Sequence, residues 1–141
     1  MVATSGARLL PEEAVRNIRE KLIPMTTVLT PNVPEAKILL SNAGVRYKEP
    51  ETVDDLIAMT KAVQSLGAEY VLLKGGHLPF KVDGTVATRE GDRKLMVDIL
   101  AGNDTITRIE SAYQNTTNTH GTGCSLACKL IFTRWNGWNG Y

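Results

Sequence analysis

Residues 118–130, NTHGTGCSLACKL, combine a glycine-rich turn, a thiol and the start of an apolar pattern with helical spacing. In Gly121, Thr122 and Gly123, the glycines let the backbone turn sharply and come close to a ligand. The helix start that follows would offer unpaired N–H groups and the positive end of its dipole, which together bind an anion such as phosphate. A Gly-Thr-Gly segment alone is more often a plain tight turn, so this anion hole needs support from other residues.

Cys124 follows the turn directly, at the expected first turn of the helix. A helix N-terminus stabilises a thiolate, so a thiol there can accept a proton near neutral pH and act as a general base or a nucleophile. Cys128 lies one turn further on, where packing as a small hydrophobic side chain explains it better. The pattern favours a functional role for Cys124 and a packing role for Cys128.

Two other segments carry polar residues at the ends of expected strands. Asn32 and Glu35, in TPNVPE, lie at the carboxyl edge where α/β sheets bind ligands, and a carboxylate there can hold Mg²⁺ through water. A turn asparagine and a first-turn helix charge explain these two residues at least equally well. Lys74, in KGGH, would pair with an anion if it is buried, although a solvated strand end is the simpler account.

These three features together predict phosphoryl transfer. That reaction needs donors for the moving phosphoryl group, a cation for its charge, a carboxylate for magnesium and a base for the accepting hydroxyl. Each feature alone is weak, and the prediction depends on their convergence at strand ends and helix starts.

The overall composition is that of one globular domain: 141 residues, 43% hydrophobic and 22% charged. Sixteen basic and fifteen acidic residues give a net charge of +1, which argues against nucleic acid or a membrane as partner. Two cysteines and two histidines predict neither a disulfide framework nor a zinc site. Without a signal peptide or a run of roughly 18 apolar residues, we expect a soluble, cytoplasmic protein.

Apolar periodicity predicts three helices that would position these residues. The first covers 11–23, with Val15, Ile18 and Leu22 on one stripe. The second begins at Pro34 and ends at Gly44. The third opens with Thr52 and Asp55 as a capping pair and ends at Gly67. A further helix is expected over 125–132, before an irregular end.

Strands are expected over 26–30 and in EYVLL at 69–73. The alternation of helices and strands predicts an α/β fold with parallel strands, and the continuous apolar centre of the second strand predicts helices on both faces. Further along, 85–89 and 94–100 resemble the arms of a β-hairpin. DTITRIESA is expected to add another extended piece.

Four motifs occur in the order MVATSGARLL, LTPNVPEA, LLKGGH and NTHGTGCSLA. They resemble the hydroxymethylpyrimidine/phosphomethylpyrimidine kinases of thiamine biosynthesis, in the ribokinase-like superfamily, and the fungal form most closely. The likeness extends from Met1 to about Ala127. It implies an α/β sandwich with a mainly parallel sheet, as a kinase domain over 1–132 and an irregular tail over 133–141. It also implies ATP as donor, Mg²⁺ as helper, and the pyrimidine alcohol and then its monophosphate as acceptors.

The resemblance also assigns roles by motif. It places the anion hole at Gly121, Thr122 and Gly123 and the catalytic base at Cys124. Asn32 and Glu35 match the phosphate and magnesium motif, with Glu35 on the metal side. Lys74 matches the lysine expected near the ATP phosphates.

The chain departs from the family pattern at both ends. It starts at the methionine of the family's DPVM motif, without the N-terminal portion that supplies the first strands and most of the pyrimidine pocket. At the other end the last helix meets CKLIFTRWNGWNGY. The sequence therefore looks shortened or frame-disrupted, with sheet edges left unpaired. Such edges are an aggregation liability, and the partners considered are a second copy of the chain or an intact paralogue.

Two alternatives remain open beside a pyrimidine kinase. One is a non-catalytic remnant or nucleotide-binding module, which would bind Mg-ATP without turnover. The other is a kinase for pyridoxal or a related vitamin alcohol, because the superfamily uses the same phosphate-side residues for several hydroxymethyl substrates.

Overall fold

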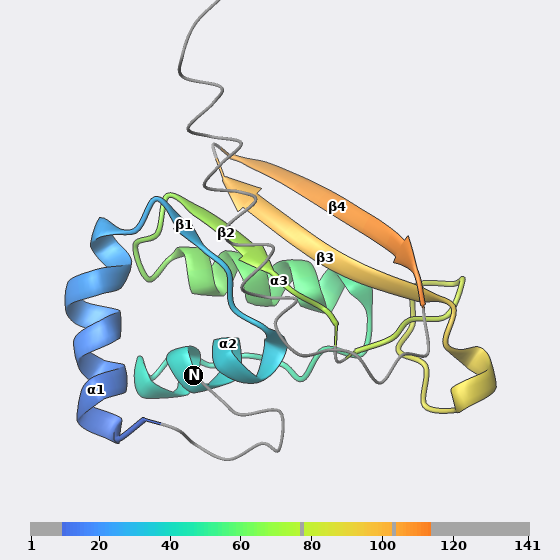
Figure 1. Ribbon diagram of the computed structural model, residues 1–141, viewed down its shortest axis with the longest axis horizontal. Helices are drawn as coiled ribbons and strands as arrows, with labels where there is room; N and C mark the ends of the chain where they lie inside the picture. The colour runs from blue at the N-terminus through green and yellow to red at the C-terminus, as the bar shows by residue number, and fades with distance from the viewer. Residues whose placement is uncertain (1–9, 77, 103, 114–141) are drawn as a thin grey trace, which may run out of the picture.

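The computed structural model describes residues 10–76, 78–102 and 104–113, which form a four-stranded sheet in the order β1-β2-β3-β4 and helices packed against it (Figure 1). The strands are β1 (Val28–Leu29), β2 (Tyr70–Leu73), β3 (Leu95–Gly102) and β4 (Thr105–Ala112). The helices are α1 (Glu12–Asn17), α2 (Val33–Asn42) and α3 (Val53–Gln64), with short helical turns over Ile18–Leu22, Ile23–Met25 and Glu90–Asp92. None of these helices is long and apolar enough to span a membrane.

The predicted first helix is confirmed, but its apolar stripe changes phase. After α1 the chain continues as a π-helix over Ile18–Leu22 and then as a 3₁₀ turn over Ile23–Met25. A π-turn holds more residues than an α-turn, so it rotates the following side chains around the axis. Leu22, predicted to face the core, is 58% exposed, and Ile23 is buried in its place at 1%.

Capping boxes start both following helices. Helix α2 begins at Val33, one residue before the predicted start at Pro34, and the side chain of Asn32 caps it. At α3, the predicted pair is confirmed: the Asp55 N–H donates to Thr52 Oγ1 at 3.2 Å, and the Thr52 N–H donates to Asp55 Oδ2 at 3.0 Å. The two side chains thus satisfy donors that a helix start leaves unpaired.

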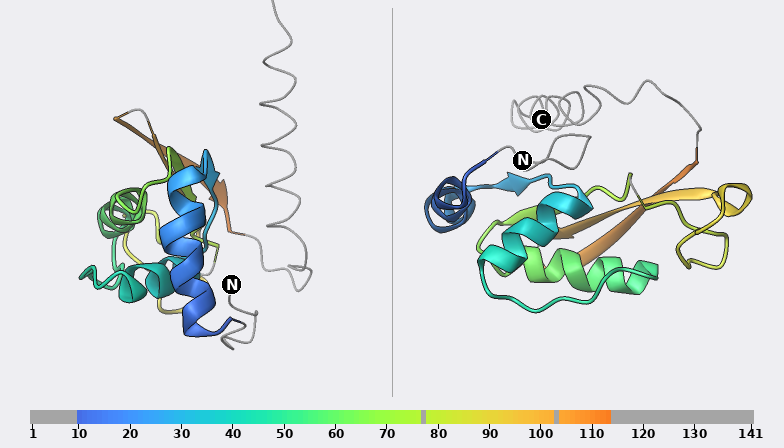
Figure 2. Two further views of the ribbon diagram at one scale, coloured as in Figure 1. Left: turned by 90° about the vertical axis from the view of Figure 1, so that its left-hand side faces the viewer. Right: turned by 90° about the horizontal axis from the view of Figure 1, so that it is seen from below.

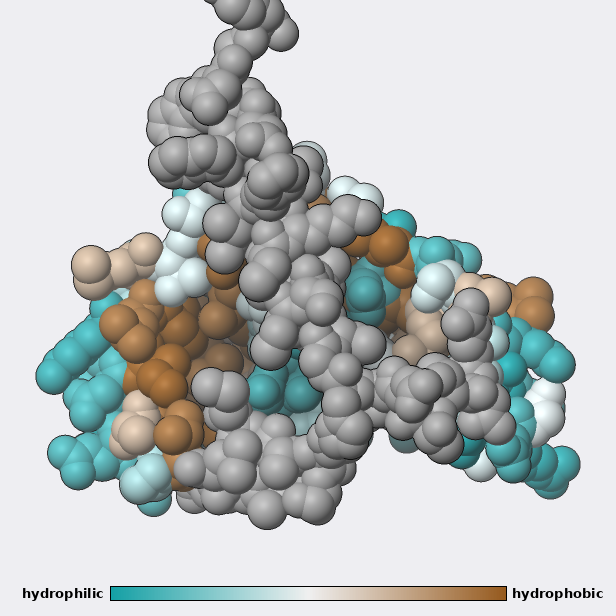
Figure 3. All heavy atoms as spheres, viewed as in Figure 1, coloured by the Kyte–Doolittle hydropathy of each residue, from teal (hydrophilic) through white to brown (hydrophobic). Residues whose placement is uncertain are grey.

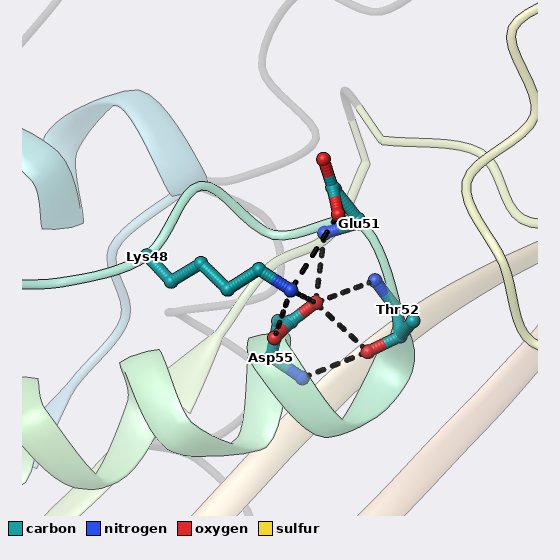
Figure 4. Close-up of polar contacts among 4 residues, drawn as sticks. All are labelled: Lys48, Glu51, Thr52 and Asp55. Carbon is teal, nitrogen blue, oxygen red and sulfur yellow. Dashed lines mark hydrogen bonds and ion pairs between the residues drawn. The ribbon is translucent and has the colours of Figure 1, made fainter.

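Asp55 also accepts hydrogen bonds from the loop that leads into α3 (Figure 4). Its Oδ2 accepts from the Glu51 N–H at 3.1 Å and from Lys48 Nζ at 3.2 Å. The hydrogen bond from the Thr52 hydroxyl, then that from the Glu51 N–H and that from Lys48, lower the pKa of Asp55 to about 2. The ionised carboxylate therefore stabilises both the helix start and the loop.

The predicted α/β class is confirmed, with a parallel pair at one end of the sheet. Strands β1 and β2 run parallel, with Val28 beside Tyr70 and Leu29 beside Val71. Strand β3 joins β2 in the antiparallel sense, and β4 joins β3 likewise. Between β2 and β3 the only helical element among the described residues is the 3₁₀ turn Glu90–Asp92, which is too short to be the crossover helix that a parallel neighbour usually has. The described strands are thus less parallel than predicted.

A β-hairpin is present, but residues 94–100 pair with a different segment from the one predicted. Residues 85–89 form no strand and contribute only isolated bridges, such as the one between Phe80 and Val86. The hairpin consists of β3 and β4, eight residues each, joined by residues 103–104. Asp104 has a φ of 58°, as tight two-residue hairpin turns require. DTITRIESA, expected only as an extra extended piece, is therefore the second arm.

Helices α2 and α3 cover one face of the sheet, as the two views of Figure 2 show. The buried core lies between these helices and the sheet. It includes Leu40, Leu56, Met59, Val63, Val71, Leu73, Phe80, Val97 and Ile99. Helix α1 lies beside the edge strand β1. Among the described residues no helix covers the opposite face, which Figure 3 shows with apolar side chains exposed near α1 and β1. The expected helices on both faces are thus seen on one face.

Candidate active site

The carboxyl ends of β1 and β2 bring two of the predicted site residues together. Asn32 and Lys74 form a parallel bridge just beyond the two strands, and the Lys74 N–H donates to the Pro31 carbonyl at 2.8 Å. Side chains alternate along β2, and Val71 and Leu73 point into the core. Lys74 therefore lies on the face away from α2 and α3, in register with Asn32. Parallel strand ends meeting at one edge produce this placement, as predicted.

Asn32 and Glu35 form the capping box of α2. The Glu35 N–H donates to Asn32 Oδ1 at 2.8 Å, and the Asn32 N–H donates to Glu35 Oε2 at 3.1 Å. Both residues are partly buried. The structural interpretation, a turn asparagine with a first-turn helix charge, is therefore confirmed, and it leaves Glu35 Oε1 without a partner among the described residues.

These residues fit a magnesium ion only if another group supplies most of its ligands. The described part of the chain contains no cluster of three or more metal-binding side chains. Mg²⁺ commonly keeps several waters and binds one or two carboxylates together with substrate phosphates. Glu35 Oε1, at the N-terminus of α2, can supply one such carboxylate oxygen, directly or through water.

The turn after Lys74 is fixed against β3. Gly75 is buried, and a Cβ placed on it would lie 2.0 Å from the Val97 carbonyl oxygen, so no other residue fits there without a backbone shift. The Gly75 N–H donates to Asp98 Oδ1 at 2.9 Å. Glycine at position 75 is therefore required by the close approach of the β3 backbone.

Asp98 was not predicted as a site residue. It interrupts the apolar run LMVDILAG of β3, and the pairing of Leu72 with Leu100 and of Leu73 with Ile99 brings it opposite Lys74 at the next position. Burial raises the pKa of its carboxyl group, while the Gly75 N–H and the positive charge of Lys74 act in the other direction. The signal in the sequence was a single carboxylate within an apolar strand.

The remaining predicted site residues, Gly121, Thr122, Gly123 and Cys124, lie outside the described residues. The anion hole and the catalytic base therefore stay predictions. The structure places Asn32, Lys74 and Asp98 side by side, just beyond β1, just beyond β2 and within β3, and Glu35 is hydrogen-bonded to Asn32. These four residues are called the strand-end site.

The sequence pattern of the family described as phosphomethylpyrimidine kinase matches residues 1–133. The chain belongs to this family. The predicted resemblance is thereby confirmed. All four residues of the strand-end site lie within the part of the chain that matches the phosphomethylpyrimidine kinase family.

Individual relatives agree with the family. The chain is 36% identical to hydroxymethylpyrimidine/phosphomethylpyrimidine kinase 2 of Schizosaccharomyces pombe, over 96% of its own length and 24% of that protein. It is 36% identical to the hydroxymethylpyrimidine/phosphomethylpyrimidine kinase of Salmonella typhimurium, over 95% of its length and 44% of that enzyme. The chain thus spans less than half the length of these relatives.

A solved structure shares both sequence and fold. The ADP complex of Bacillus subtilis pyridoxal kinase is 34% identical to this chain, with a TM-score of 0.66, and the match covers 90% of this chain and 42% of that one. The likeness confirms that the described sheet and helices form part of the fold of these small-molecule kinases.

Proposed function

We propose that the chain supplies the ATP side of a kinase that phosphorylates hydroxymethylpyrimidine and then its monophosphate in thiamine biosynthesis. The observation that carries the proposal is the pairing of Asn32 and Lys74 at the carboxyl ends of two parallel strands, beside the capped start of α2. A cation and a carboxylate at such an edge suit a nucleotide phosphate and its magnesium. The family match supports the choice of reaction.

Each candidate residue has a role in this proposal. Lys74 pairs with the ATP phosphates, and Glu35 supplies a carboxylate oxygen for Mg²⁺, which would neutralise phosphate charge when bound. The turn Gly121, Thr122 and Gly123 donates backbone N–H groups to the phosphoryl group while it passes from ATP to the acceptor hydroxyl, and Cys124 takes the proton of that hydroxyl. The substrate is a small molecule, and we place the reaction in the cytoplasm.

Two observations favour specific alternatives. The 34% identity to a pyridoxal kinase favours pyridoxal as a second candidate acceptor. The placement of the described candidate residues at the proposed phosphate side keeps a nucleotide-binding module, which binds Mg-ATP without turnover, as the other alternative.

Transfer of labelled γ-phosphate tests these possibilities. The chain is mixed with the N-terminal part of the Salmonella typhimurium relative, and transfer from Mg-ATP is measured with hydroxymethylpyrimidine and with pyridoxal. We expect transfer to hydroxymethylpyrimidine to be preferred, to be lost in Lys74→Ala and to persist in Lys61→Ala, which removes an exposed lysine of α3. Preferred transfer to pyridoxal would support the second acceptor. Mg-ATP binding without transfer would leave only the module.

A further inference from the structure

Asp98 is a half-buried carboxylate that the proposed function does not use. It lies in β3 between Val97 and Ile99, both of which are fully buried in the core. The alternation of the strand therefore directs Asp98 to the face opposite α2 and α3, the same face as Lys74. On β4 its neighbour across the ladder is Ile109, an apolar residue.

The contacts of Asp98 lead to the backbone that carries Lys74. Its Oδ1 accepts the Gly75 N–H at 2.9 Å, and the Lys74 N–H donates to the Pro31 carbonyl at 2.8 Å. Two successive peptide groups are thus held from the two neighbouring strands. The Val97 carbonyl oxygen also lies close to the turn, 2.0 Å from the position that a Cβ of residue 75 would take.

We propose that Asp98 is a positioning residue: by holding the Lys74–Gly75 turn against β3, it places the Lys74 ammonium group for the phosphates of a nucleoside triphosphate. This inference rests on the proposed function. Asp98 acts through Lys74 and does not itself touch the nucleotide, because a carboxylate facing the phosphates would repel them.

The hydrogen bond and the charge of Asp98 have opposite effects on an anionic ligand. The bond orders the turn and favours binding, whereas the negative charge partly neutralises Lys74 and disfavours it. Asp98→Asn removes the charge and retains a carbonyl oxygen that can accept the Gly75 N–H. Asp98→Ala removes both. A residue that serves only the stability of the sheet would show no such contrast in nucleotide affinity.

Calorimetric titrations of the full chain with Mg-ATP and with AMP test the proposal. In Asp98→Ala we expect Mg-ATP to bind about tenfold more weakly, the usual effect of one hydrogen bond that involves a charged group, with AMP much less affected. Asp98→Asn should bind Mg-ATP at least as tightly as the unsubstituted chain. The matched control is Asp83→Ala, which removes a carboxylate bond of the same length, 2.9 Å, to the Thr85 N–H in another turn. It should leave both affinities unchanged.

Hydrogen exchange supplies a readout that needs neither nucleotide nor a folded alanine variant. In the unsubstituted chain the Gly75 amide should exchange slowly, whereas the amide of the exposed Gly76, which has no partner among the described residues, should exchange fast. In Asp98→Asn the protection of Gly75 should persist.

The outcomes separate the inference from the proposed function. If the unsubstituted chain binds no Mg-ATP, the proposed function fails, and the inference fails with it. If Mg-ATP binds but Asp98→Ala matches Asp83→Ala, or if the Gly75 amide exchanges as fast as Gly76, the inference is overturned and the proposed function stands.

Discussion

At the scale of single residues, the site depends on close backbone contacts as much as on charged side chains. Lys74 and Asn32 were predictable, because each follows an apolar run and parallel strand ends meet at one edge. Asp98 was not, because only the register between β2 and β3 brings it opposite Lys74. The sequence shows a carboxylate in a strand, but it does not show which neighbour that strand will have.

Gly75 gives the first prediction at this scale. A methyl group in Gly75→Ala would lie 2.0 Å from the Val97 carbonyl oxygen, so the turn or β3 must shift. We expect a loss of about 1–3 kcal/mol in the free energy of unfolding, measured with denaturant, together with weaker Mg-ATP binding. Gly91→Ala is the control, since nothing lies within 4 Å of its Cβ position. Equal stability of the two variants would argue against the tight contact.

Cys124 gives the second prediction, which comes from the sequence alone. If the thiol is the general base, Cys124→Ser in the reconstituted kinase should slow single-turnover phosphoryl transfer by roughly 10²-fold or more, with ATP affinity almost unchanged. Cys128→Ser should leave both quantities nearly unchanged. Small and equal effects of the two substitutions would mean that Cys124 is a packing residue.

At the scale of elements, local signals predicted the helices and one long-range pairing escaped prediction. Thr52 and Asp55 predicted the start of α3 correctly, because a capping box forms within four consecutive residues and is therefore visible in the sequence. The predicted hairpin partner of 94–100 was wrong. Residues 85–89 have the residue types of a strand, but in the structure Val86 and Leu95 each form a single bridge to Phe80 instead of pairing with one another. The π-turn after α1 likewise left no recognised signal in the sequence.

The π-turn yields a prediction about neighbouring apolar residues. Ile23→Ala should reduce the free energy of unfolding by about 2–5 kcal/mol, because Ile23 is buried in the core. Leu22→Ala should change it by less than about 0.5 kcal/mol, because Leu22 lies on the surface. Thermal or denaturant unfolding of both variants measures the difference. The reverse order would restore the regular helical stripe that the sequence predicted.

The capping box of α3 predicts a step in stability at acid pH. The pKa of Asp55 is lowered from 3.8 to about 2 in the folded chain, so its carboxylate stabilises the fold above the unfolded value. That contribution should be lost as the pH falls from about 4 to about 2. In Asp55→Asn this part of the acid loss should disappear, and the variant should be less stable than the unsubstituted chain at neutral pH. Asp54→Asn controls for the loss of one first-turn charge. An acid profile of Asp55→Asn identical to the unsubstituted one would contradict the assignment.

At the scale of the whole molecule, the chain is one portion of a kinase fold, with the strand-end site at the parallel part of its sheet. The α/β class followed from the order of helices and strands. The balance of parallel and antiparallel pairs did not, because strand direction depends on whether a helix connects two strands in space. The site is assembled from three strands, whereas the sequence offered its residues as separate motifs.

Binding of Mg-ATP to the full chain tests the central claim most directly, with Lys74→Ala and Lys61→Ala measured alongside. If Asn32, Lys74 and Glu35 form a phosphate site, affinity should fall from Mg-ATP through Mg-ADP to AMP, because each step removes phosphate charge. Lys74→Ala should weaken Mg-ATP binding by about tenfold or more, the usual loss for a charge-assisted contact to phosphate, and Lys61→Ala should not change it. No binding by the unsubstituted chain, or equal affinities for the three nucleotides that Lys74→Ala leaves unchanged, would contradict a phosphate site at the ends of β1 and β2.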